Sequence, residues 1–123
     1  MHVTLDVFSG RPNPSWELSQ EQSSEFLKKI SKLKTKENFQ LDSSKYELGY
    51  RGFIVEEEAN FALKSRRFEV YNGIVNVVEN NSSYALEDKG YSIERWLLQT
   101  APNSLDELVK YVKQEIENKK AKS

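Results

Sequence analysis

The sequence has no cysteine and a single histidine, His2, beside the first residue. Without cysteine the chain has no disulfide, no thiolate nucleophile and no cysteine-bound metal, which suits a reducing compartment, and the cytoplasm is the simplest location. A catalytic triad or a histidine metal cluster would have to be built around one ring at the start of the chain. We therefore predict no cofactor and no metal site, and an enzyme is the less favoured class.

The sequence also has no large excess of positive or negative charge and no long apolar segment. The 18 basic and 19 acidic residues nearly cancel, so the composition offers no basic field of the size that nucleic acid requires. The sequence has no stretch of about 18 consecutive apolar residues and no signal-peptide pattern, and we expect neither export nor membrane contact. A chain of 123 residues fits one domain, which we predict over residues 1–117, with a frayed tail over residues 118–123.

Five segments have the character of strands. Apolar and polar residues alternate from Val3 to Val7 within residues 2–8, and further strands are predicted over 48–55, 67–71, 74–78 and 84–88, next to turn residues. Between two of these segments, Asn72-Gly73 favours a type I′ turn, which needs positive φ at both central residues. This turn also sets the register of the hairpin, and it predicts Phe68 opposite Val77 on a buried face.

Three helices are predicted from capping residues that are followed by apolar stripes. Ser19 with Gln22 forms a capping box, and so does Ser104 with Glu107. Ser92 caps a shorter helix that precedes the last one. The result is an α+β domain with an antiparallel or mixed sheet of four to five strands and about three helices packed mainly on one face.

The stretch from residue 5 to residue 18 is the most specific feature of the chain, because an alternating strand runs into a stiff loop. Pro12 and Pro14 fix their own φ angles and bias Arg11 and Asn13 toward extended backbone. Such a loop either presents its side chains to a partner or routes the chain from a strand into a helix. Both interpretations stay open at this point.

Arginine and aromatic side chains supply further candidate contacts, because they bury a large area for little lost rotamer entropy. Trp16 is expected at a loop surface, and Trp96 is expected in the core, on the apolar stripe of its helix. Arg51 and Arg95 flank aromatic residues, and their structural alternative is an ion pair with a glutamate. The predicted binding residues are Arg11, Asn13, Trp16, Tyr50, Arg51 and Arg95.

These residues favour a non-catalytic protein-binding module, such as a small adaptor or inhibitor, that uses the rigid loop and has another protein as its partner. The alternative is a small-ligand-binding protein in which Arg11 and Arg51 hold a carboxylate or phosphate group. An enzyme built on carboxylates comes third, with Asp6, Glu69 and Asp88 near strand ends. A carboxyl pair with a raised pKa in a cleft would favour that enzyme, whereas an exposed apolar patch would favour the binding module.

Overall fold

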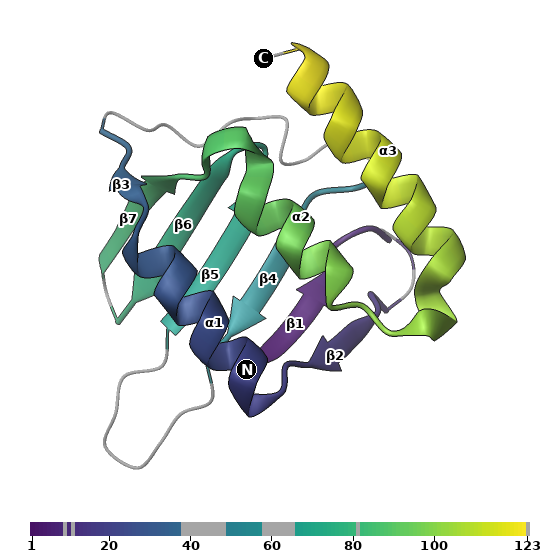
Figure 1. The fold of residues 1–123 in the computed structure, drawn as a ribbon, viewed down its shortest axis with the longest axis horizontal. Helices are drawn as coiled ribbons and strands as arrows, with labels where there is room; N and C mark the ends of the chain where they lie inside the picture. The colour runs from purple at the N-terminus through teal and green to yellow at the C-terminus, as the bar shows by residue number, and fades with distance from the viewer. Residues whose placement is uncertain (9, 11, 38–48, 58–65, 81, 123) are drawn as a thin grey trace.

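One antiparallel sheet of seven strands forms the body of the molecule (Figure 1). The computed structural model describes residues 1–8, 10, 12–37, 49–57, 66–80 and 82–122. The strands are β1 (His2–Leu5), β2 (Ser15–Glu17), β3 (Lys34–Thr35), β4 (Phe53–Glu56), β5 (Arg66–Tyr71), β6 (Ile74–Glu79) and β7 (Ser82–Glu87). Their order across the sheet is β2-β1-β4-β5-β6-β7-β3, and every neighbouring pair is antiparallel.

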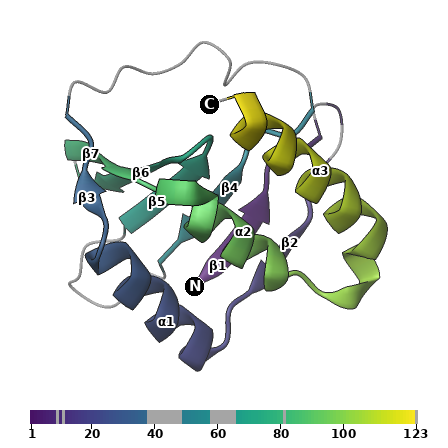
Figure 2. The ribbon, with the colours of Figure 1, turned by 45° about the horizontal axis from the view of Figure 1, so that its top comes forward.

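Three helices lie on one face of this sheet, as Figure 1 and Figure 2 show from two directions. They are α1 (Gln20–Ser31), α2 (Ser92–Gln99) and α3 (Asp106–Lys122), and the 3₁₀ turns η2 (Lys89–Tyr91) and η3 (Asn103–Leu105) precede α2 and α3. The predicted α+β class, antiparallel sheet and three helices are confirmed, but the predicted four to five strands are too few. The two additional strands, β2 and β3, are three and two residues long, which is too short for an alternation to be recognised.

The hairpin between β5 and β6 follows the prediction from its turn residues. Both of them have positive φ, 54° at Asn72 and 81° at Gly73, as a type I′ turn requires. The register places Phe68 opposite Val77, and both side chains are fully buried. The short-range signal of the turn therefore fixes which face of these two strands meets the helices.

The core lies between the sheet and the helices. One row of buried side chains crosses the sheet in register from β2 to β6 and consists of Trp16, Val3, Val55, Phe68 and Val77. Phe26 of α1 packs edge-on against Phe68, with ring centroids 5.0 Å apart. Ile93 and Leu97 of α2 are buried as well, so α1 and α2 together cover the centre of the sheet.

Two strands are shorter than the alternation predicts. β1 ends before residue 8, because two amides that follow it donate to the side chain of Asn13 and not to a neighbouring strand. β4 begins at Phe53 and not near residue 48, because Gly52 has a φ of 99°, which lies outside the strand region. Both ends are set by contacts and backbone angles that hydrophobic alternation does not reveal.

The start of α2 and the end of α3 also differ from the prediction. Asp88 caps α2 in place of Ser92, since its two carboxyl oxygens accept the amides of Ile93, at 2.8 Å, and Glu94, at 3.1 Å. A side-chain oxygen in this position satisfies amides that have no partner within the helix. α3 continues as a helix to Lys122, and so includes most of the tail over residues 118–123. That this tail frays stays a prediction.

Candidate functional site

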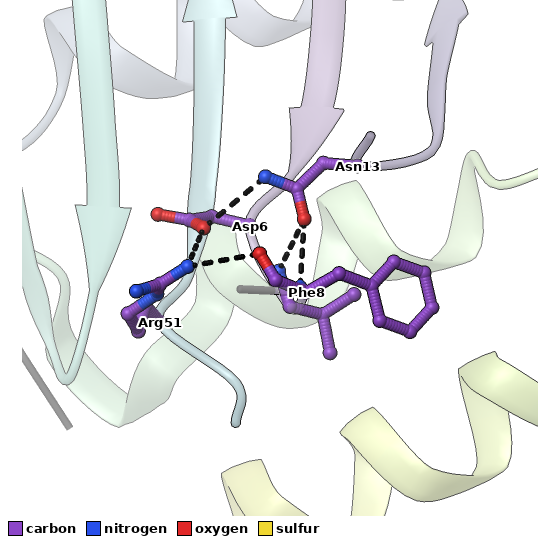
Figure 3. Close-up of polar contacts among 5 residues, drawn as sticks. Asp6, Phe8, Asn13 and Arg51 are labelled. Carbon is purple, nitrogen blue, oxygen red and sulfur yellow. Dashed lines mark hydrogen bonds and ion pairs between the residues drawn. The ribbon is translucent and has the colours of Figure 1, made fainter. Parts of the chain in front are cut away.

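The loop between β1 and β2 is closed by its own side chains (Figure 3). The Oδ1 atom of Asn13 accepts the amides of Val7, at 3.0 Å, and Phe8, at 2.7 Å. The Nδ2 atom of Asn13 donates to Oδ1 of Asp6 at 3.3 Å. Both ends of the Asn13 amide are therefore bonded within the loop, and Arg11 lies outside the described residues.

Arg51 ties this loop to the segment that leads into β4. Its Nη2 atom donates to Oδ1 of Asp6 at 2.8 Å and to the carbonyl of Phe8 at 3.1 Å, and Figure 3 shows Asp6 between Arg51 and Asn13. The Arg51 and Asp6 side chains are only 21% and 22% exposed. The guanidinium charge is thus compensated by a carboxylate of the same chain, and Arg51 holds the loop against the sheet.

Trp16 is buried, so its predicted place at a loop surface is wrong. It belongs to β2, pairs with Val3 of β1 and is 9% exposed. Its indole N–H donates to Oγ1 of Thr100, just after α2, at 2.8 Å, and its ring meets Phe53 edge-on. Trp16 is buried because it is the middle residue of a three-residue strand. Pairing of β2 with β1 directs the side chain of that residue into the core.

Tyr50 is buried beside a carboxyl group that sequence reasoning did not single out. Its hydroxyl donates to Oε2 of Glu94 in α2, and Oε1 of Glu94 accepts no hydrogen bond of ordinary geometry from the described residues. A usable signal existed in the sequence, because Glu94 stands three and four residues before Leu97 and Leu98. That spacing puts Glu94 on the buried stripe of the helix.

Burial raises the pKa of Glu94 to about 7, because the charged form loses its solvation. The nearby Asp88 carboxyl raises this pKa further, and the Tyr50 hydroxyl lowers it. Burial raises the pKa of Asp88 as well. The two carboxyl groups therefore match one part of the enzyme hypothesis, but Glu94 and Asp88 are only 0% and 1% exposed. A substrate has no access to groups that are so deeply buried.

A groove of about 470 Å³ lies between α1, α2 and α3. α2 turns Arg95, Trp96 and Gln99 toward this groove, whereas Glu94 lies on the opposite side of the helix. Apolar surface in the groove comes from residues such as Trp96 and Val109, and its charged residues are Lys29, Arg95, Lys113 and Glu117. Three cations and one carboxylate thus border an apolar surface.

Trp96 packs against the core but is only half-buried, because one side of it lines this groove, so its predicted place in the core is met only in part. Its ring stacks on Phe26, with centroids 6.2 Å apart and planes 26° apart. The ammonium group of Lys29 lies 5.8 Å from the centre of the indole. The indole N–H donates to no residue that the structure describes, whereas the N–H of Trp16 is bonded within the fold.

Arg95 is the one predicted contact residue, among those described, that lines the groove. Its Nη1 atom lies 3.5 Å from Oε1 of Glu117 in α3, and both side chains are 45% exposed. The described members of the predicted set do not form one site. Asn13 and Arg51 meet at Asp6 in the loop, and Trp16 and Tyr50 are buried.

Comparisons of the chain with protein-family models, with curated proteins and with solved structures found no significant match. The described residues include no cluster of three or more histidine, cysteine, aspartate or glutamate side chains that is placed to hold a metal ion. Among those residues, none of the helices is long and apolar enough to span a membrane.

Proposed function

We propose that the protein is a non-catalytic binding module for another protein, and that it contacts this partner through the groove between the three helices. The observation that carries the proposal is Trp96, a half-buried tryptophan that lines the groove together with Lys29, Arg95 and Lys113. Tryptophan and arginine are enriched among the residues that dominate binding energy at protein interfaces. A groove between helices suits a peptide segment, which lays one apolar side chain inside and leaves its backbone at the rim.

The loop is the weaker candidate for the contact surface. Asn13 and Arg51 bond to groups of their own chain, so a partner would have to break those bonds before it made new ones. The small-anion alternative meets the same difficulty, since Asp6 already compensates the charge of Arg51. The enzyme alternative is weaker because the carboxyl pair whose pKa values are raised, Asp88 and Glu94, is buried away from a substrate.

Selection from a displayed peptide library tests the proposal. The library is panned on the wild-type protein, and binders that also bind the Trp96→Ala variant are removed. Peptides that survive are expected to shift the amide resonances of α1, α2 and α3 and to leave those of β6 and β7 unchanged. Survivors that perturb only the sheet, or a selection that yields none, would contradict the proposal.

A second pair of variants guards against a folding defect in the first. Gln99 is exposed and lines the groove, so Gln99→Trp fills the groove without removing a core contact. Gln114 is also exposed, on α3 outside the groove, and Gln114→Trp is the matched control. Binding of the selected peptides is expected to fall at least tenfold with Gln99→Trp and to stay within twofold with Gln114→Trp.

A further inference from the structure

We propose that the partner segment is acidic, with carboxylates on either side of one large apolar side chain, and that Glu117 of this chain competes with it for Arg95. This inference rests on the proposed function, because it names the chemistry of the partner at the same groove. It joins two observations, a surplus of cations around an apolar surface and an exposed internal ion pair within that surface.

The charge of the groove differs in sign from that of the whole chain. The chain carries a formal net charge of −1, whereas the groove is lined by Lys29, Arg95 and Lys113 against Glu117 alone. Lys113 forms no ion pair with any residue that the structure describes, and Lys29 has only an exposed pair with Glu25 at 3.8 Å. Complementary charge steers a partner and fixes its register, so the surplus of cations selects carboxylates.

The apolar part of the groove selects what lies between those carboxylates. Trp96 and Val109 line the groove, and the indole is held in place by stacking on Phe26. The volume of about 470 Å³ lies within the range of roughly 300–1,000 Å³ that pockets for drug-sized groups have. A leucine or an aromatic side chain of the partner fits there and removes apolar surface from water.

The pair between Arg95 and Glu117 is the internal counterpart of the contact that we propose. The two groups are 3.5 Å apart, and each is 45% exposed, so the pair contributes little to stability. A carboxylate of the partner can replace Glu117 on the guanidinium without an unpaired buried charge being left behind. Glu117 therefore lowers the affinity for an acidic segment both by competition and by repulsion.

Fluorescence anisotropy with defined peptides tests this chemistry. The probe is a pool of fluorescein-labelled nonapeptides with leucine, phenylalanine or tyrosine at the centre and glutamates around it. The same pool with glutamine in place of glutamate is the neutral comparison. We expect the acidic pool to bind at least tenfold more tightly at low salt, and this advantage to shrink as the salt concentration rises.

Two matched pairs of variants locate the effect in the groove. Glu117→Gln is expected to tighten binding of the acidic pool about two- to fivefold, whereas Glu107→Gln leaves it unchanged, because Glu107 is an exposed residue of α3 outside the groove. Lys113→Glu is expected to weaken binding at least tenfold, and Lys110→Glu, on the exposed side of α3, changes it less than twofold.

The outcomes separate this inference from the proposed function. If selected peptides bind at the groove but are neutral, or if Glu117→Gln weakens binding, the acidic chemistry is wrong while the proposed function stands. If neither selected peptides nor the acidic pool bind at the groove, both proposals fail. Equal effects of Lys113→Glu and Lys110→Glu would also overturn the inference, because they would show a response to net charge alone.

Discussion

The β1–β2 loop and the helical groove contain the same kinds of residue and use them in opposite ways. In the loop, Asn13 and Arg51 bond to groups of their own chain, and Trp16 is buried with its N–H bonded. In the groove, Lys113 has no ion-pair partner among the described residues, and Trp96 is half-buried. We propose the groove and not the loop as the recognition surface because residue types that concentrate binding energy are more available to a partner where they are exposed or lack an ion pair within the chain.

The carboxyl groups near the two regions also differ in how their charge is compensated. Asp6 in the loop cluster lies 2.8 Å from the guanidinium of Arg51. Glu94, on the hidden side of the helix that forms the groove, contacts no cation in the described parts of the chain, and burial raises its pKa to about 7. One carboxylate is compensated by a cation, and the other group is tolerated best in its neutral form.

The largest expected effect separates the two tryptophans. Trp16→Ala leaves a cavity beside Phe53 and should lower the free energy of unfolding by about 3–5 kcal/mol. Trp96→Ala removes a half-buried ring and should lower it by roughly 1–2 kcal/mol, because less apolar area leaves the core. Urea denaturation of both variants measures the difference. Equal losses would mean that the groove is part of the core and that the comparison fails.

The next effect is a dependence of stability on pH that arises from Glu94. Its folded-state pKa of about 7 lies above the ordinary value of 4.5, so the folded state binds this proton more tightly than the unfolded state does. Its contribution is therefore complete below about pH 4.5 and is lost as the pH rises through 7. Since one pKa unit corresponds to about 1.4 kcal/mol, the loss by pH 8 is about 3 kcal/mol.

Glu94→Gln isolates this effect. Glutamine is neutral and keeps an oxygen that accepts from the hydroxyl of Tyr50, so the stability of the variant should be closest to that of the wild type at pH 5 and exceed it most at pH 8. Both proteins carry His2→Gln, so that the only histidine does not contribute to the slope. Urea midpoints measured from pH 5 to pH 8 test the expectation. Parallel curves for the two proteins would show that Glu94 ionises without cost.

How much of this the sequence predicts depends on the range of the signal. The Asn72-Gly73 turn and the Ser19 capping box are local, and both are present with the predicted partners. Two other local signals fail, because Asp88 caps α2 in place of Ser92 and Ser104 lies within η3. The place of Trp16 depends on pairing between β2 and β1, and that of Trp96 depends on how closely α1 and α3 approach α2. Neither arrangement leaves a periodic trace in the chain, so the sequence does not reveal that Trp16 is the more deeply buried of the two tryptophans.

For the candidate binding residues, too, the sequence lacks the long-range information that places them. Residue type predicted Arg95, which lines the groove, and equally Arg51, which bonds to Asp6. The sequence does not distinguish the two, because the partner of Arg51 is 45 residues away and is brought near by the pairing of β1 with β4. The sequence alone does not distinguish Lys113 and Glu117 from other charged residues of a solvent-exposed helix face. The structure shows that they line the groove together with residues of α2.

A smaller effect tests whether Asn13 is architectural. Asn13→Ala removes the acceptor of two backbone amides and should lower the free energy of unfolding by about 1–3 kcal/mol, the usual cost of polar groups left without a partner. Gln99→Ala, at an exposed groove position, should change it by less than about 0.5 kcal/mol. Thermal denaturation of both variants measures the two changes. If Asn13→Ala does not lower the stability, the bonds of Asn13 are not needed for the fold, and the loop again becomes a candidate recognition surface.

The smallest expected effect concerns the two prolines of the loop. Pro12 is exposed and Pro14 half-buried, and replacement by alanine gives the unfolded chain more freedom, which should cost about 0.4–1 kcal/mol at each position. Because Asn13 and Arg51 still hold the loop through their hydrogen bonds, the double variant Pro12→Ala/Pro14→Ala should bind groove-selected peptides within twofold of the wild type. Anisotropy titrations beside urea denaturation measure both quantities. A variant that keeps its stability and loses binding would place recognition in the loop, because preorganisation by the prolines would then matter for the partner and not for the fold.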